Sequence, residues 1–394
     1  MIPRDLASVL RADARHLPVL TVVGPRQSGK STLARATFPD HAYVNLERPD
    51  LREAAREDPR TLLAQHARGA IFDEIQHVPE LLSWMQVEVD ERADPGRFVL
   101  TGSNQQALSA AVPQTLAGRT SVLTLLPPDL GELGRFPKPP DDLWTTLWTG
   151  AFPRIHDTGM PADRWLGSYV ATYVERDVRQ LVNVVDLLPF STFLRLAAAR
   201  TGQETNLSAL GADAGITQPT ARAWLGVLEA SFLAHRIPAW FRNTRKQLVK
   251  APKLHLVDAG LVCSLLGVRS PSELRGHPLR GPIFESWVAT ELIKQRHNLG
   301  LTPRIFHWRE TRGVEVDLVV DDGTEILLVE VKSGATVSSD WFGPLVKARE
   351  TAAQDHPAAA VRAVILFGGD EPATRHGVDV VPWREIGRLR PRDG

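Results

Sequence analysis

The sequence has little that would direct it to the cell exterior or into a membrane. It holds a single cysteine, Cys263, in 394 residues, so neither an internal disulfide nor a zinc site built from thiolates can form. No apolar run approaches the ~20 residues of a membrane-spanning helix, and residues 1–5 lack the apolar core of a signal peptide. We therefore expect a cytoplasmic protein with no membrane partner.

An excess of one charge is also lacking, because 46 Lys and Arg residues balance 46 Asp and Glu residues. With 43% hydrophobic residues, this balance is typical of a globular chain and excludes a disordered or uniformly basic one. The middle of the chain is nevertheless basic, since residues 151–280 carry 16 basic and 10 acidic side chains and no acidic residue lies between Glu229 and Asp258. Such a local excess is typical of a phosphate-binding surface or of a solvated face.

The strongest chemical signal is a glycine-rich segment near the N-terminus. An apolar run, residues 19–23, leads into GxxxxGKS, and a helical pattern follows. This order predicts a P-loop, in which backbone N–H groups surround phosphates at the positive end of a helix. Lys30 would add a positive charge, and Ser31 would bind Mg²⁺. The residues predicted to bind the nucleotide, ATP, are Gly24, Pro25, Arg26, Gln27, Ser28, Gly29, Lys30, Ser31 and Thr32.

Two further apolar runs end in polar residues. Residues 70–72 precede Asp73, which suits the support of Mg²⁺, and Glu74, which suits polarising the attacking water. Residues 97–102 precede Ser103 and Asn104, either of which could sense the γ-phosphate; Asn104 is the catalytic candidate named with Lys30 and Glu74. Ligands bind at the carboxyl ends of parallel strands, so we predict an α/β P-loop ATPase module over residues 1–135.

Arg119 follows a helical segment and is the fourth candidate for a catalytic role. It could serve as an arginine finger or sensor, or it could be a structural residue on a surface loop. If it acts in trans, the chain self-associates.

Residues 189–250 predict a winged helix-turn-helix, which a helical linker over residues 136–188 precedes. Thr217 would cap the second helix, whose first residues lie where recognition helices enter the major groove of DNA. A basic run would bind the backbone phosphates and comprises Arg236, Arg242, Arg245, Lys246, Lys250 and Lys253. The candidates for DNA contact are Gln218, Thr220, Arg222, Arg242, Arg245 and Lys246. The alternative is a spacer that contacts protein partners.

Residues 251–394 predict a PD-(D/E)xK nuclease-like domain. Glu285 lies on an apolar helix, Asp317 ends a short strand, and Glu330 and Lys332 end a second strand beyond an Asp-Gly hairpin turn. Strand alternation puts Glu330 and Lys332 on one face, and Asp317 on the paired strand can share it. Asp317 and Glu330 would hold a second Mg²⁺ or Mn²⁺ while Lys332 orients water and Glu285 completes the set. The alternative is a retained fold without catalysis.

The order of motifs resembles that of prokaryotic AAA-type ATPases whose P-loop module is joined to a restriction-endonuclease-like domain of unknown function. The resemblance covers most of residues 1–335 and implies an ATPase together with a nuclease-like fold. Ala151 stands where the family has a second glycine, and Leu318 stands where an aromatic residue is common. Besides the P-loop, the matching segments are Asp73–Gln76, Leu100–Ser103, Leu116–Arg119, Gly150–Pro153, Tyr173–Asp177, Asp258–Leu261, Phe284–Glu285, Trp308–Arg309 and Glu315–Asp317.

The leading hypothesis is an ATP-hydrolysing protein coupled to a DNA-binding, nuclease-like C-terminal domain. The rival is a nucleotide-dependent switch with protein partners and a catalytically silent nuclease fold. A steep salt dependence of duplex DNA binding would favour the first, because phosphate contacts release counterions.

Overall fold

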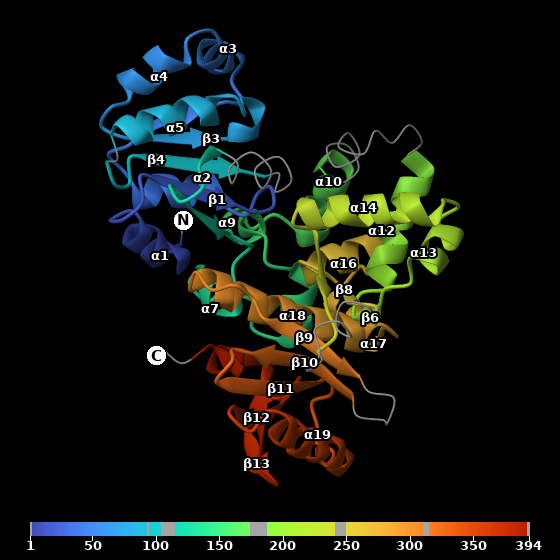
Figure 1. The fold of residues 1–394 in the computed structure, drawn as a ribbon. Coiled ribbons are helices and arrows are strands. Elements are labelled where there is room, and N and C mark those ends of the chain that lie inside the picture. Colours follow the sequence, from blue (N-terminus) through green and yellow to red (C-terminus); the bar gives the residue numbers. More distant parts are fainter. Residues whose placement is uncertain are drawn as a thin grey trace. The chain divides into compact units, whose positions relative to one another are not determined.

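The structure is a computed structural model that describes residues 2–92, 94–103, 115–173, 187–240, 250–309 and 315–391. The chain divides into two compact units. Unit 1 comprises residues 1–128, 230–232 and 297–301, and unit 2 comprises residues 129–229, 233–296 and 302–394. Within these described ranges, no helix is long and apolar enough to cross a membrane. Figure 1 shows the elements in chain order from blue to red.

Unit 1 is built on a five-stranded parallel sheet in the order β2-β3-β4-β1-β5, which confirms the predicted α/β architecture. Its strands are β1 (Val19–Val23), β2 (Ala42–Asn45), β3 (Ala70–Asp73), β4 (Phe98–Gly102) and β5 (Thr120–Thr124). The three central strands are buried throughout and read as continuous apolar runs. The edge strands β2 and β5 are only half-buried and mixed in composition, so the sequence did not predict them.

Helices pack on this sheet and form the core of unit 1. On one face, Leu10 and Leu33, from the first two helices, pack against Leu20, Ile71 and Val99 of the sheet. The helices are α1 (Leu6–Asp13), α2 (Lys30–Thr37), α3 (Pro49–Glu57), α4 (Pro59–Gln65) and α5 (Leu81–Glu91), with a short 3₁₀ turn η1 (Ile75–His77). Because α2 begins directly after the loop that follows β1, the predicted P-loop lies at the carboxyl end of β1.

The first part of unit 2 is helical, and α13 and α14 lie where the sequence predicts a helix-turn-helix. The Thr217 hydroxyl accepts a hydrogen bond from the N–H of Thr220, which is the predicted N-cap, and the Asn206 side chain caps α13 by accepting one from the N–H of Ala209. The helices are α7 (Leu130–Leu133), α8 (Leu143–Thr149), α9 (Pro153–Thr158), α10 (Ala162–Tyr169), α12 (Leu187–Ala199), α13 (Leu207–Asp213) and α14 (Gln218–Ala230).

A three-stranded antiparallel sheet, β6-β8-β7, accompanies these helices. Its strands are β6 (Gln203–Glu204), β7 (Ala234–Ile237) and β8 (Lys253–Leu256). The middle strand β8 lies beyond residue 250, the predicted end of the winged segment, yet it pairs with strands on both sides. The helices α16 (Ala259–Leu266), α17 (Pro271–Gly276) and α18 (Arg280–Asn298) follow it.

The C-terminal part of unit 2 holds a mixed sheet in the order β13-β14-β12-β11-β10-β9. Strands β9, β10 and β11 form an antiparallel meander, and α19 then crosses to β12, which is parallel to β11. The elements are β9 (Ile305–Arg309), β10 (Glu315–Asp321), β11 (Glu325–Lys332), η3 (Ser339–Trp341), α19 (Phe342–Asp355), β12 (Ala360–Phe367), β13 (Ala373–Arg375), β14 (Val378–Pro382) and η4 (Trp383–Leu389).

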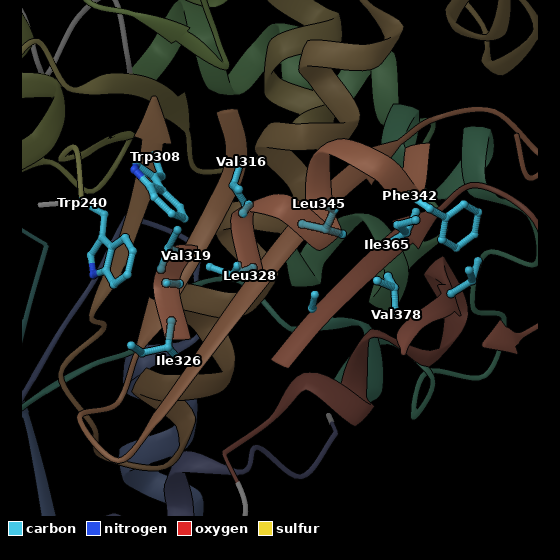
Figure 2. Close-up of a cluster of buried hydrophobic side chains, with 14 of the residues drawn as sticks. Trp240, Trp308, Val316, Val319, Ile326, Leu328, Phe342, Leu345, Ile365 and Val378 are labelled. Atoms are coloured by element: carbon cyan, nitrogen blue, oxygen red, sulfur yellow. The ribbon is translucent and has the colours of Figure 1, made fainter. Parts of the chain in front are cut away.

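The predicted hairpin between β10 and β11 is confirmed, since Asp322 N–H donates to the carbonyl oxygen of Glu325 across the turn (3.0 Å). One detail is corrected. Asp317 does not end a strand but lies inside β10, where the pairing with β9 is irregular between Val316 and Val319. Figure 2 shows the apolar cluster that this sheet forms with α19, in which Leu345 packs among residues of the strands.

Candidate functional site

The loop between β1 and α2 adopts backbone conformations that favour glycine. Gly24 has φ 153° and Gly29, the N-cap of α2, has φ 97°. A Cβ at Gly24 would lie 2.1 Å from the carbonyl oxygen of Leu125, so no larger residue fits. The hydroxyl oxygen of Ser28 is buried and makes no hydrogen bond within the described residues. Burying an unpaired hydroxyl is costly, and this donor therefore fits a polar ligand held in the loop.

Lys30 is the first residue of α2, and its ammonium lies over this loop. It donates hydrogen bonds to the carbonyl oxygens of Gly24 (3.0 Å) and Pro25 (2.9 Å). Burial lowers the pKa of Lys30, although Glu74 and Asp73 act in the opposite direction. Of the other predicted loop residues, Arg26 lies 3.7 Å from the Glu47 carboxylate, and Thr32 lies in the first turn of α2.

Ser31 and Asp73, predicted from separate segments to hold Mg²⁺, are in direct contact. The Ser31 hydroxyl lies 2.8 and 2.9 Å from the two carboxylate oxygens of Asp73. Asp73 also accepts hydrogen bonds from the hydroxyls of Thr101 and Tyr43. Burial, followed by the bond to Asp73, raises the pKa of Tyr43. The sequence analysis missed Tyr43 because it lies on the unpredicted edge strand β2.

Glu74 follows Asp73 in a left-handed backbone conformation, with φ 56°. Its carboxylate accepts hydrogen bonds from the Gln76 amide and from the Ser103 hydroxyl (3.1 Å). Two residues were predicted as candidates for sensing the γ-phosphate. Ser103 is the one that contacts Glu74, and the other, Asn104, lies outside the described residues. Gln76 belongs to a motif named in the resemblance, and its contact with Glu74 gives that motif a role in orienting the carboxylate.

Arg4 contacts the phosphate loop, although no sequence pattern predicted it as a site residue. Its guanidinium donates to the carbonyl oxygens of Ser28 (3.0 Å) and Leu126 (2.8 Å). These two carbonyls belong to the loop after β1 and to the segment after β5. A single arginine in a short N-terminal segment cannot be distinguished from an ordinary surface residue by its neighbours in the sequence.

Arg119 lies at the amino-terminal ends of the strands, whereas the P-loop lies at their carboxyl ends. Its carbonyl oxygen accepts a hydrogen bond from the N–H of Val19, the first residue of β1, whereas the P-loop follows Val23 at the other end. A five-residue strand spans about 15 Å. The guanidinium is also paired with Asp90, at 2.5 and 2.8 Å. Arg119 therefore does not reach its own chain's phosphate loop, and the finger hypothesis remains only in its trans form.

The candidates for DNA contact are in part accessible. Gln218 and Arg222 are exposed at the start of α14, whereas the Thr220 hydroxyl bonds to that of Thr217 within the cap. Arg242, Arg245 and Lys246 lie outside the described residues. The described members of the basic run have other partners: Arg236 pairs with Glu229, Lys250 donates to the carbonyl of Arg309, and Lys253 meets Glu285.

The four residues of the predicted nuclease-like site come together, and a second lysine joins them. Lys332 lies 2.6 Å from Glu330, and Lys253 lies 2.8 Å from Glu285 and 4.0 Å from Asp317. The sequence analysis placed Lys253 only in a basic run, because its partners lie on α18 and β10, far along the chain. All five side chains are less than one third exposed.

The carboxyl groups of this site have raised pKa values. Burial, and then the negative charge of Asp317, raise the pKa values of Glu285 and Glu330, while the ammonium groups of Lys253 and Lys332 act in the opposite direction. Burial also raises the pKa of Asp317, which accepts a hydrogen bond from the N–H of Val331 (2.8 Å). Among the described residues, no group of three or more His, Cys, Asp or Glu side chains is arranged to hold a metal ion. In this arrangement Glu285 and Glu330 are each paired with a lysine.

Two motifs of the resemblance prove to be partners in the structure. The Asp258 carboxylate accepts hydrogen bonds from the N–H of Ala151 (2.7 Å) and of Leu261 (2.8 Å), capping α16. A Cβ at Gly260 would lie 2.8 Å from the backbone nitrogen of Gly150, so glycine is needed for this close approach. These segments form a joint between the end of α8 and the beginning of α16. Of the Tyr173–Asp177 motif, residues 174–177 lie outside the described ranges.

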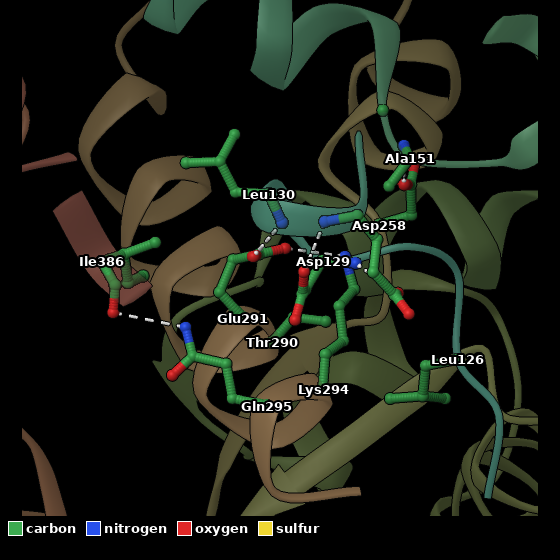
Figure 3. A network of polar contacts seen from close by, with 12 residues as sticks. Leu126, Asp129, Leu130, Ala151, Asp258, Thr290, Glu291, Lys294, Gln295 and Ile386 are labelled. Atoms are coloured by element: carbon green, nitrogen blue, oxygen red, sulfur yellow. Dashed lines mark hydrogen bonds and ion pairs between the residues drawn. The ribbon is translucent and has the colours of Figure 1, made fainter. Parts of the chain in front are cut away.

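Helix α18 carries a second buried polar network, shown in Figure 3. Glu291 accepts hydrogen bonds from the Lys294 ammonium (2.8 Å) and from the N–H of Leu130 (2.7 Å), the first residue of α7. Gln295 donates to the carbonyl oxygen of Ile386 (3.3 Å). The helix that presents Glu285 is thereby fixed to the beginning and to the end of unit 2.

Three family matches cover consecutive parts of the chain. Residues 16–134 match the AAA domain, so this part is an AAA-type P-loop ATPase domain. Residues 140–272 match a domain of unknown function (DUF8612), and residues 280–386 match a second one (DUF4143).

Two relatives that resemble the chain over most of its length are named as uncharacterized proteins. The uncharacterized protein Rv2008c of Mycobacterium tuberculosis is 28% identical over 339 residues, which cover 85% of this chain and 75% of the relative. The uncharacterized protein Mb2031c of Mycobacterium bovis matches with the same values. Among solved structures, the Walker-type ATPase PABY2304 of Pyrococcus abyssi aligns with 13% identity and a TM-score of 0.44, over 66% of this chain and 94% of that one.

Proposed function

We propose that unit 1 binds ATP with Mg²⁺ and hydrolyses it. The observation that carries this proposal is the contact of Ser31 with Asp73 beside Lys30 and Glu74, at the carboxyl edge of the parallel sheet. Ser31 would bind Mg²⁺ and Asp73 would orient it. The metal, when bound, would neutralise charge on the phosphates.

The remaining groups have separate tasks in this proposal. The N–H groups of the loop and of the first turn of α2 bind the phosphate oxygens. When the nucleotide binds, the Lys30 ammonium leaves the carbonyl oxygens of Gly24 and Pro25 and donates to the phosphate oxygens instead. Glu74 orients and deprotonates the attacking water. The Ser103 hydroxyl and the Gln76 amide hold the Glu74 carboxylate for this task.

Replacing Glu74 by glutamine tests the assignment. We expect phosphate release to fall by roughly 100-fold or more, because the amide cannot accept the proton, while ATP still binds within about threefold of the parental affinity. A malachite-green assay and binding of a fluorescent ATP analogue measure the two quantities. Glu80→Gln is the matched control, since Glu80 is an exposed carboxylate of the same unit, paired with Arg56. Parental hydrolysis by Glu74→Gln would refute the role of Glu74.

We further infer that the C-terminal part of unit 2 is restriction-endonuclease-like in fold and silent as a nuclease. The order α18, β9, β10, β11, α19, β12 supports the nuclease-like comparison, in which α18, β10 and β11 carry Glu285, Asp317, Glu330 and Lys332. The ion pairs of these carboxylates with two lysines favour the silent alternative over metal-dependent cleavage. ATP hydrolysis would then drive a switch rather than DNA cutting.

Contact with DNA is proposed for the exposed beginning of α14. Arg222 is the basic residue of α14. Arg222→Ala should therefore weaken duplex binding and reduce the magnitude of the slope of log affinity against log salt by about one. Fluorescence anisotropy with a labelled duplex at several salt concentrations measures this. Arg195→Ala, on α12, is a control that changes the same charge elsewhere in unit 2. Binding that does not depend on salt would instead support a protein partner at this helix.

A further inference from the structure

Lys253 reaches the carboxylate site from outside the sheet that carries Asp317 and Glu330. It is the first residue of β8, whose backbone pairs with β6 and β7, and its side chain is only 10% exposed. Its ammonium lies 2.8 Å from a carboxylate oxygen of Glu285 and 4.0 Å from one of Asp317. One positive charge therefore contacts carboxylates of two different elements, α18 and β10.

A divalent metal ion would need these same oxygens. Mg²⁺ or Mn²⁺ binds carboxylate oxygens at about 2.1 Å, and an ammonium within hydrogen-bonding distance of Glu285 occupies the space in front of that carboxylate. A buried site screens charge poorly, so an ammonium and a metal ion side by side would repel each other strongly. Lys332 does not compete for the same partner, because its ammonium lies 2.6 Å from Glu330.

We propose that Lys253 is the resident cation of the carboxylate site, holding Glu285 and Asp317 in place of a divalent metal ion. The site takes up Mg²⁺ or Mn²⁺ only when Lys253 is withdrawn. Since Lys253 belongs to β8, a displacement of the small sheet beside the helix-turn-helix would open the site. This inference rests on the proposed silence of the nuclease-like site and is independent of ATP hydrolysis.

The test is a titration of nucleotide-free full-length protein with Mn²⁺, in which free Mn²⁺ is measured by electron paramagnetic resonance. We expect weak binding by the parent and by Lys253→Arg, which keeps the charge. Lys253→Met should bind one ion per chain at least tenfold more tightly, and Lys253→Met combined with Asp317→Asn should lose that gain. If Lys253→Met does not fold by circular dichroism, Lys253→Gln carries the test, because it removes the charge, keeps both carboxylates and still offers Glu285 a hydrogen-bond donor.

Two results would overturn the proposal. One is a folded Lys253→Met protein that binds Mn²⁺ no better than the parent. The other is a parent that already binds one Mn²⁺ tightly in a manner that Asp317→Asn abolishes. Mg²⁺-dependent plasmid cleavage by the parent that Asp317→Asn abolishes would refute the silent site as well. Unimproved binding without any cleavage would refute only the role of Lys253.

Discussion

Replacement of Lys30 by alanine is expected to reduce ATP hydrolysis by roughly 100-fold or more and to leave unit 1 folded. The loss follows from the place of the ammonium, which lies over the phosphate loop and is held there by the carbonyls of Gly24 and Pro25. No other lysine lies in the loop or in α2 to replace it. Folding should survive because burial lowers the pKa of Lys30, which means that the fold accommodates this charge at a cost.

The measurement compares phosphate release and thermal unfolding in the same preparations. We expect the midpoint of thermal unfolding to change by only a few degrees, on the order of 1 kcal/mol, while hydrolysis is lost. Lys30→Arg is an informative companion, because it keeps the charge but not the compact ammonium. Hydrolysis at the parental rate in Lys30→Ala would remove the P-loop assignment. Loss of folding together with hydrolysis would show a structural role instead.

Replacement of Asp258 by alanine is expected to destabilise unit 2 by roughly 3 kcal/mol, because the N-cap bond to one N–H group is lost and a second buried N–H group is left without an acceptor. The two N–H groups are those of Ala151 and Leu261, which both donate to this carboxylate. Figure 3 shows Asp258 directed at Ala151. Asp258→Asn should cost less, because its amide oxygen still accepts a hydrogen bond.

Urea unfolding followed by tryptophan fluorescence measures this effect selectively. Of the 10 tryptophans only Trp84 lies in unit 1, so the signal reports mainly on unit 2. Asp213→Ala is the matched control, since Asp213 is an exposed carboxylate of unit 2, paired with Arg200, and should cost less than about 1 kcal/mol. An equally small cost for Asp258→Ala would show that the joint between α8 and α16 does not depend on this carboxylate.

At the carboxylate site, the alternation of side chains along a strand predicted one contact but could not predict another. Alternation along β11 correctly put Glu330 and Lys332 within reach of each other, because side chains two apart in a strand share a face. The same reasoning could not find Lys253, since no local rule links a residue of β8 with a helix and a strand that follow much later. Counting charges likewise grouped Lys253 with residues of a basic surface, although it is buried among carboxylates.

By itself, the sequence determined the phosphate loop, its lysine and serine, and the adjacent carboxylates Asp73 and Glu74. These are local features: glycines at fixed offsets from a buried strand and the start of a helix dictate the loop, and parallel strands bring their carboxyl ends to one edge. Only the tertiary structure decided which partner each charge meets. Arg119 pairs with Asp90 far from the phosphate loop, and Lys253 pairs with Glu285, because electrostatic contacts depend on distance in space and not on separation along the chain.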